Sequence, residues 1–186
     1  MSIYDYDNDF AHYEANEATK RKLGQCWTPY SIIEQLLDMH GLITDKNSVW
    51  KDENKTDLDP TMGAGNIVIA TLYRRIVECG QDPITALSNV YGVELDKKTL
   101  EYAQIRIEKF MMKVEDNLHY KFTNEEWNNI RKIIMHNFVC SDIFDWNIEE
   151  WRHYTPAEKD AIKQKKKREL EEKNAKNDTD WGDYVQ

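Results

Sequence analysis

Apolar residues recur at helical spacing in four stretches of the chain. The first follows Thr28 and Pro29, a typical cap and first helical position, and Gly41 suits its end. The others begin at Asn66, after the cap residue Asp96, and after the capping box of Thr123 and Glu126. The positions predicted to face the core are Ile32, Ile33, Leu36, Leu37, Ile67, Val68, Leu72, Ile76, Val77, Leu100, Ala103, Ile107, Phe110, Val114, Trp127, Ile130, Ile133 and Ile134.

Short apolar runs between these helices predict three buried strands. They lie near Leu58, at residues 89–95 and at residues 138–140, and residues 44–56 are polar enough to predict a loop. Strands that alternate with helices are typical of a parallel sheet, because each crossover places a helix on the sheet. The sequence therefore predicts an α/β protein with a mostly parallel sheet and covering helices.

The two ends of the chain differ from this pattern. Residues 1–19 contain five acidic residues and no Lys or Arg, which predicts a mobile or loosely packed arm. Residues 20–150 form the expected domain, and residues 151–186 a charged helical or disordered tail that starts with a cap signature at Thr155 and Glu158. The cations of residues 163–168 fit either a solvated helix or a surface that contacts nucleic acid.

Composition narrows the classes of function. The chain of 186 residues has 25 Lys and Arg against 34 Asp and Glu, a net charge of −9, which argues against non-specific coating of nucleic acid. No apolar run approaches the roughly 20 residues that span a bilayer, so we expect a cytoplasmic protein without membrane contact. Three cysteines and five histidines lack metal-ligand spacing, and Cys140 is expected in the core.

Candidate chemistry gathers where the predicted strands end. A glycine turn, Asp59 to Gly65, follows the first strand, and its glycines allow backbone to approach a ligand closely. Glu94 ends the second strand, where a carboxylate can accept hydrogen bonds from ribose hydroxyls. Asp142 follows the third strand and could accept from an exocyclic amine. Ligands of open α/β sheets bind at these carboxyl ends, so the pattern indicates a nucleoside site.

Four motifs in this order resemble the cofactor-binding motifs of adenine-specific DNA methyltransferases: GQCWTP, DPTMGAGN, VYGVELD and CSDIFDW. The similarity runs from about residue 20 to 146 and implies a Rossmann-like class I fold that binds S-adenosylmethionine. It implies cofactor contacts from Trp27, Thr28 and Pro29 at the methionine end, Asp59, Pro60, Thr61, Gly63 and Gly65 around the amino-acid moiety, Glu94 at the ribose, Leu95 on the adenine, and Asp142 and Ile143 at the adenine edge.

The chain departs from this family in its second half. Members carry a catalytic loop, Asn/Asp-Pro-Pro-Tyr/Phe, which grips the flipped base, but no two of the four prolines here are adjacent. Only 40 mostly polar residues follow Trp146, and they contain no evident buried strand, so the family pattern is truncated before the catalytic loop. Loss of later strands would leave the strand near Leu58 at an exposed edge. We expect a second chain, self-association or the tail helix to cover that edge.

Three functions are compatible with these features, and whether the chain itself catalyses methyl transfer stays open. It could bind S-adenosylmethionine without a complete catalytic site and act with a partner, or sequester the cofactor, as would suit a phage or a restriction–modification system. It could be a complete small DNA methyltransferase with a divergent site. It could also be a non-catalytic module that binds protein or nucleic acid. The groups available to a divergent site are Asp145, Trp146, Tyr154, Asp180, Trp181 and Tyr184.

Overall fold

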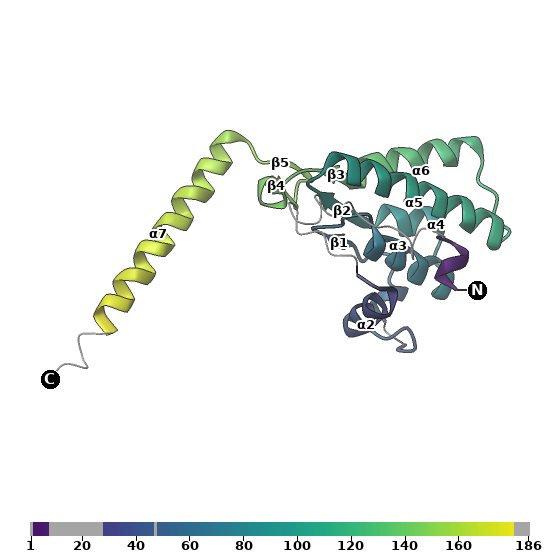
Figure 1. Cartoon of the computed structure of the whole chain (residues 1–186), viewed down its shortest axis with the longest axis horizontal. Coiled ribbons are helices and arrows are strands. Elements are labelled where there is room, and N and C mark those ends of the chain that lie inside the picture. Colours follow the sequence, from purple (N-terminus) through teal and green to yellow (C-terminus); the bar gives the residue numbers. More distant parts are fainter. Residues whose placement is uncertain (1, 8–27, 47, 181–186) are drawn as a thin grey trace. The chain divides into compact units, whose positions relative to one another are not determined.

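The computed structural model describes residues 2–7, 28–46 and 48–180, with side chains described up to residue 174. The chain divides into two compact units, Met1–Ile143 and Phe144–Gln186. The first unit contains a parallel three-stranded sheet covered by helices, which confirms the predicted α/β class (Figure 1). In the described part of the chain, no helix is both long and apolar enough to cross a membrane.

The sheet has the order β1-β2-β3, formed by Asp57–Asp59, Val90–Glu94 and Phe138–Cys140. Asp59 is in register with Gly92, and Glu94 with Cys140, so all three strands run in one direction. Because the chain crosses over between parallel strands, helices must lie between them in sequence. Among the described residues β1 pairs with β2 only, which places β1 at the edge of the sheet.

The four predicted helices form with nearly the predicted bounds, as α2 (Tyr30–His40), α3 (Asn66–Tyr73), α5 (Lys97–Asn117) and α6 (Asn124–Asn137), and a π-helical turn at Arg74–Glu78 continues α3. A further short helix, α4 (Pro83–Ser88), was not predicted. Asp96 caps α5 by accepting from the Thr99 N–H, and Thr123 and Glu126 form the predicted capping box of α6. Helices α3 to α6 pack against the sheet, and α2 packs against α3.

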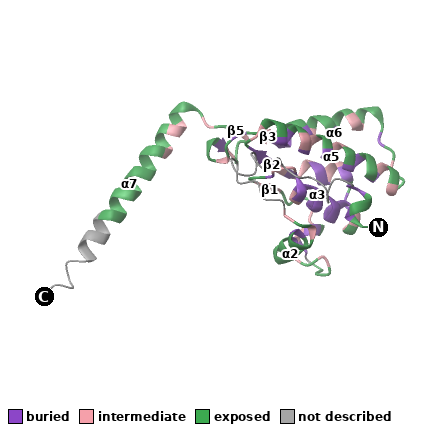
Figure 2. Ribbon diagram, in the orientation of Figure 1, coloured by how far each residue is buried: buried purple, intermediate pink, exposed green. Residues whose placement is uncertain are grey.

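The core lies between the sheet and these helices (Figure 2). All five predicted core positions of α5, from Leu100 to Val114, are buried. On α2, however, only Ile33 and Leu37 are buried, while Ile32 and Leu36 are about half exposed, at 45% and 48%. A predicted apolar face is thus divided between the core and the surface.

Three sequence-based expectations are corrected. Cys140 is exposed rather than buried, because it lies at the last position of β3, where the strand leaves the core. The polar stretch 44–56 contains a 3-10 turn, Val49–Lys51, which buries Trp50. Residues 3–7 are not loosely packed, since Ile3 and Tyr6 enter the core; most of the expected arm lies outside the described residues.

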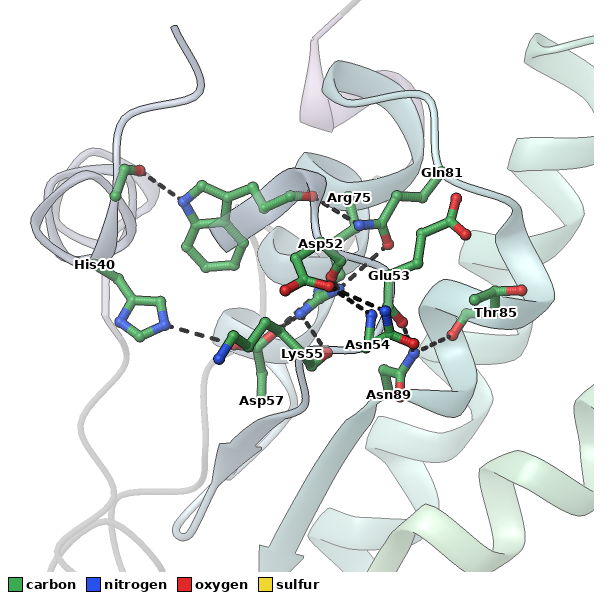
Figure 3. A network of polar contacts seen from close by, with 12 residues as sticks. His40, Asp52, Glu53, Asn54, Lys55, Asp57, Arg75, Gln81, Thr85 and Asn89 are labelled. Carbon is green, nitrogen blue, oxygen red and sulfur yellow. Dashed lines mark hydrogen bonds and ion pairs between the residues drawn. The ribbon is translucent and has the colours of Figure 1, made fainter. Parts of the chain in front are cut away.

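A buried arginine fixes the start of β1 (Figure 3). Arg75 donates from Nε to Asp57 Oδ2 at 2.8 Å and from Nη2 to the Lys55 carbonyl at 2.8 Å. Gln81 accepts from Arg75 and donates to the Trp50 carbonyl, which ties the 3-10 turn to the same group. This network gives the buried guanidinium its partners and sets where β1 enters the sheet.

The second unit contains a small antiparallel pair of strands and one long helix. Strands β4 (Trp146–Asn147) and β5 (Arg152–His153) pair with each other, and helix α7 spans Pro156–Asp180. Thr155 and Glu158 form the predicted cap signature at the start of α7, with Thr155 N–H donating to Glu158 at 2.7 Å. The structure therefore favours the helical alternative for this part of the tail.

Candidate functional site at the strand ends

The loop after β1 is held against β2 by its own backbone. The Met62 N–H donates to the Val93 carbonyl at 2.9 Å, and the Gly65 N–H donates to the Met62 carbonyl at 2.8 Å. Gly63 and Gly65 adopt φ values of 54° and 86°. These left-handed values are strained for residues with a Cβ, so glycine is needed at both positions. The loop then ends directly in α3, whose first backbone N–H groups lack helical partners.

Glu94 joins this loop to the end of β2. Its carboxylate is buried and accepts from the Gly63 N–H at 2.9 Å and from the Asp96 N–H at 2.8 Å. A carboxylate has roughly four acceptor positions, so two bonds to the backbone leave capacity for a ligand. The structure thus brings Glu94 and the glycine turn together, as the strand-end pattern predicted.

Asp59, the last residue of β1, lies in the same electrostatic environment. The pKa of Asp59 is raised to about 6, mainly by burial and to a smaller extent by the Glu94 carboxylate, while the hydrogen bond from the Thr61 N–H opposes this rise. Two carboxylates at adjacent strand ends repel each other, so a cation between them would be stabilised. Perturbed acids of this kind are typical of functional sites.

The end of β3 lies beside the end of β2. The Ser141 N–H donates to the Glu94 carbonyl at 3.0 Å, so the residues that follow β3 begin next to Glu94. Asp142 is exposed and Ile143 is half-buried, while Leu95 is 60% exposed. An exposed leucine next to acidic acceptors is a suitable surface for an aromatic base, because it offers apolar contact beside hydrogen-bond partners.

The remaining predicted site residues have different positions. Pro60 and Thr61 are exposed on the loop after β1. Thr28 is half-buried and Pro29 exposed at the start of α2, and among the described residues neither forms a hydrogen bond to the glycine loop. Trp27 lies outside the described residues.

Arg106 is a positioning residue that the sequence analysis missed. Its buried guanidinium donates from Nη1 to the Ala64 carbonyl at 2.6 Å and to Asn66 Oδ1 at 2.8 Å, and its Nη2 forms an ion pair with buried Asp7. One side chain of α5 therefore links the glycine loop, the start of α3 and the N-terminal segment. The sequence does contain one indication that Arg106 is buried, because this residue lies on the apolar face of α5, between Ala103 and Phe110.

Gly92 is a second residue without a predicted role. A Cβ at this position of β2 would lie 2.4 Å from the Met62 sulfur and 3.1 Å from a ring carbon of Phe138. The missing side chain lets Met62 cover the middle of the strand and seat the loop on the sheet. A glycine inside a strand pattern is the signal for such close approach.

Two other regions contain none of these acids or glycines. A groove of about 660 Å³ runs between α5 and α6 and is lined by Met112, Trp127 and Arg131 among others. In the second unit, Trp146 is buried and makes edge-on contacts with Trp151 and His153, at 5.4 and 4.7 Å between ring centroids. Trp146 therefore anchors its own hairpin. In the described part of the chain, no cluster of three His, Cys, Asp or Glu could hold a metal ion.

The parallel sheet with its covering helices defines an α/β fold, in which ligands commonly bind at the carboxyl ends of the strands, where the glycine turn and the acids lie. The chain belongs to the N-6 DNA Methylase family, whose model matches residues 3–185 and so extends beyond the four motifs on both sides. This match supports a methyltransferase-like function in DNA methylation. No curated protein and no solved structure matches the chain significantly.

Proposed function

We propose that this chain binds S-adenosylmethionine at the ends of β1, β2 and β3. The observation that carries the proposal is the convergence of Asp59, Glu94 and the glycine loop, held together by the bond from the Gly63 N–H to Glu94. The cofactor has a cationic sulfonium and amino group, a ribose and an adenine. The two acids suit the cationic and hydroxyl groups, the glycine turn suits close approach, and exposed Leu95 suits the base.

The chain would act as the cofactor-binding part of a DNA adenine methyltransferase. Methyl transfer needs an electrophilic methyl and a nucleophilic amine held in line, which is mainly a matter of alignment. The residues at the strand ends supply only the cofactor side of that alignment. Because these 186 residues contain no adjacent prolines, we assign the base-gripping loop to a partner of this domain. Without such a partner, the same site would sequester the cofactor.

The edge of the sheet supports a partner at this position. Strand β1 pairs only with β2 among the described residues, so its other side presents backbone donors and acceptors to a further strand. Next to it, His40 at the end of α2 lies 3.9 Å from Asp57 of β1. The same helix exposes an apolar stripe of Ile32, Leu36 and Met39, of which Met39 is 84% exposed. A partner that adds a strand here could also cover this stripe.

Isothermal titration with S-adenosylmethionine tests the cofactor site. We expect Glu94→Gln to weaken binding by 1–3 kcal/mol, about the worth of a hydrogen bond to a charged group. The control is Glu101→Gln, which removes an exposed α5 carboxylate that lies 3.8 Å from Lys97 Nζ. Mass spectrometry of the mixture afterwards shows whether the cofactor stays intact. Absence of heat with the unchanged protein would refute the proposal.

Transfer of labelled methyl groups to DNA tests the assignment of the catalytic loop. The isolated chain is expected to bind the cofactor but to transfer no label. Label incorporated into DNA by the isolated chain would overturn the partner assignment and favour a complete methyltransferase with a divergent site. Size-exclusion chromatography with light scattering separates self-association from the need for a different chain.

A further inference from the structure

One side of helix α7 has lysines and no acids, whereas the other side has all of the acids together with Lys165 and Arg168. At 3.6 residues per turn, five lysines fall within about 120° of the helix circumference. The acidic residues of Pro156–Asn174 all lie outside this arc. The basic stripe consists of Lys159, Lys163, Lys166, Lys167 and Lys173, and the acids opposite are Glu158, Asp160, Glu169, Glu171 and Glu172.

Most of the basic stripe faces solvent. Side chains from Lys163 onward on this stripe are exposed, and that of Lys167 is 78% exposed (Figure 2). Lys159 pairs with Asp145 at 3.0 Å, and Lys167 lies 3.9 Å from Glu171. Exposed ion pairs of this kind are worth about 0–1 kcal/mol, so a stronger anion can replace the carboxylates.

An exposed aromatic ring accompanies the stripe. Phe144 is 80% exposed, and the Lys166 Nζ lies 5.9 Å from the centre of its ring. A large apolar ring beside lysines is costly to leave in water and can stack on a base or pack on a sugar. The combination of cations with an aromatic side chain distinguishes this surface from a helix that is merely solvated.

We infer that the basic stripe of α7 binds the phosphate backbone of DNA. From Lys159 to Lys173 it extends about 21 Å at 1.5 Å per residue, long enough to follow several phosphates of a duplex with one charge per roughly 1.7 Å. Helices that lie on membranes need an apolar face opposite the charged one, and α7 has acids there instead. An acidic protein would also complement the stripe, but the family acts on DNA.

The test is fluorescence anisotropy of the full chain with a labelled 30-base-pair duplex at several salt concentrations. The variant Lys163→Gln/Lys166→Gln removes two charges from the stripe. Its matched control, Lys165→Gln/Arg168→Gln, removes two charges from the same segment but from the other side of the helix. Both pairs of side chains are exposed, so we expect both variants to fold like the unchanged chain.

The stripe variant should bind DNA several-fold more weakly, and the slope of log affinity against log salt should fall by about 2. The control should keep most of the affinity and most of the slope. Equal effects of the two variants would overturn the stripe, as would no DNA binding at low salt. Binding to anionic vesicles or to an acidic protein in place of DNA would also overturn it. Titration with S-adenosylmethionine should give the same affinity for both variants, so failure here is distinguishable from failure of the cofactor site.

Discussion

The raised pKa of Asp59 predicts that binding of S-adenosylmethionine depends on pH. Burial and the nearby Glu94 carboxylate hold this pKa at about 6 in the unliganded chain. The difference from the ordinary value of 3.8 corresponds to about 3 kcal/mol against the ionised form. Because the folded pKa is raised, the contribution of Asp59 to folding stability is complete below about pH 4 and is lost as pH rises through about 6.

A cationic ligand reverses this preference. The ionised Asp59 carboxylate attracts the cationic cofactor. The carboxyl group of Asp59 must therefore lose its proton when the complex forms. With a pKa of about 6, about a quarter of the protein has ionised Asp59 at pH 5.5 and nearly all at pH 7.5. The affinity should therefore fall about fourfold from pH 7.5 to pH 5.5. At pH 6, about half a proton should be released for each cofactor bound.

Isothermal titration at constant ionic strength measures both quantities, the second by comparing buffers of different ionisation enthalpy. The lowest pH is 5.5 because the isoelectric point is about 5.1, and a protein without net charge is prone to associate. The Asp59→Asn variant keeps the shape of the side chain but cannot titrate. It should bind about tenfold more weakly at pH 7.5 and lose the pH dependence. Equal affinities of the unchanged protein at pH 5.5 and pH 7.5 would show that Asp59 does not face the cofactor.

Three further predictions test the structure around the site. Gly92→Ala should destabilise the fold by about 1–3 kcal/mol in thermal unfolding, because the new Cβ meets the Met62 sulfur, and the same change should cost less in a Met62→Ala background, where that sulfur is gone. Arg75→Met should cost about 3 kcal/mol in urea unfolding, since it removes the buried guanidinium that pairs with the Asp57 carboxylate at the start of β1. Arg131→Met, in an exposed pair, should cost under about 1 kcal/mol, and similar losses for both arginines would contradict the network. Asp142→Ala should weaken cofactor binding by about 1–3 kcal/mol in the same titration, and unchanged affinity would remove this residue from the site.

Helices and strands with strong local signals could be predicted from the sequence. The apolar face of α5 and the capping box before α6 depend on residues three or four apart, so their spacing is sufficient. The glycine turn and Glu94 could be paired because parallel strands end at one edge of a sheet. Their direct contact, from the Gly63 N–H to Glu94, follows from that topology.

Contacts between distant parts of the chain could not be predicted in this way. Trp50 is buried although it lies in a mostly polar stretch, and the Gln81 side chain that donates to its carbonyl comes 31 residues later in the chain. Asp7 belongs to a strongly acidic stretch that resembles a solvated terminus, and only the position of Arg106 on an apolar face hints at a buried partner. Such pairs need the three-dimensional arrangement, since no local pattern identifies which residue is the partner.

The ion pair between Asp7 and Arg106 also decides where this domain can be cut. A fragment designed from the four motifs alone would start near residue 20 and lose Asp7, Ile3 and Tyr6. The guanidinium inside the domain would then lose its buried carboxylate, at a cost of several kcal/mol, beside the very carbonyl at Ala64 that shapes the glycine loop. A protein produced for crystallisation should therefore keep the first seven residues. An N-terminal affinity tag should be separated from them by a spacer.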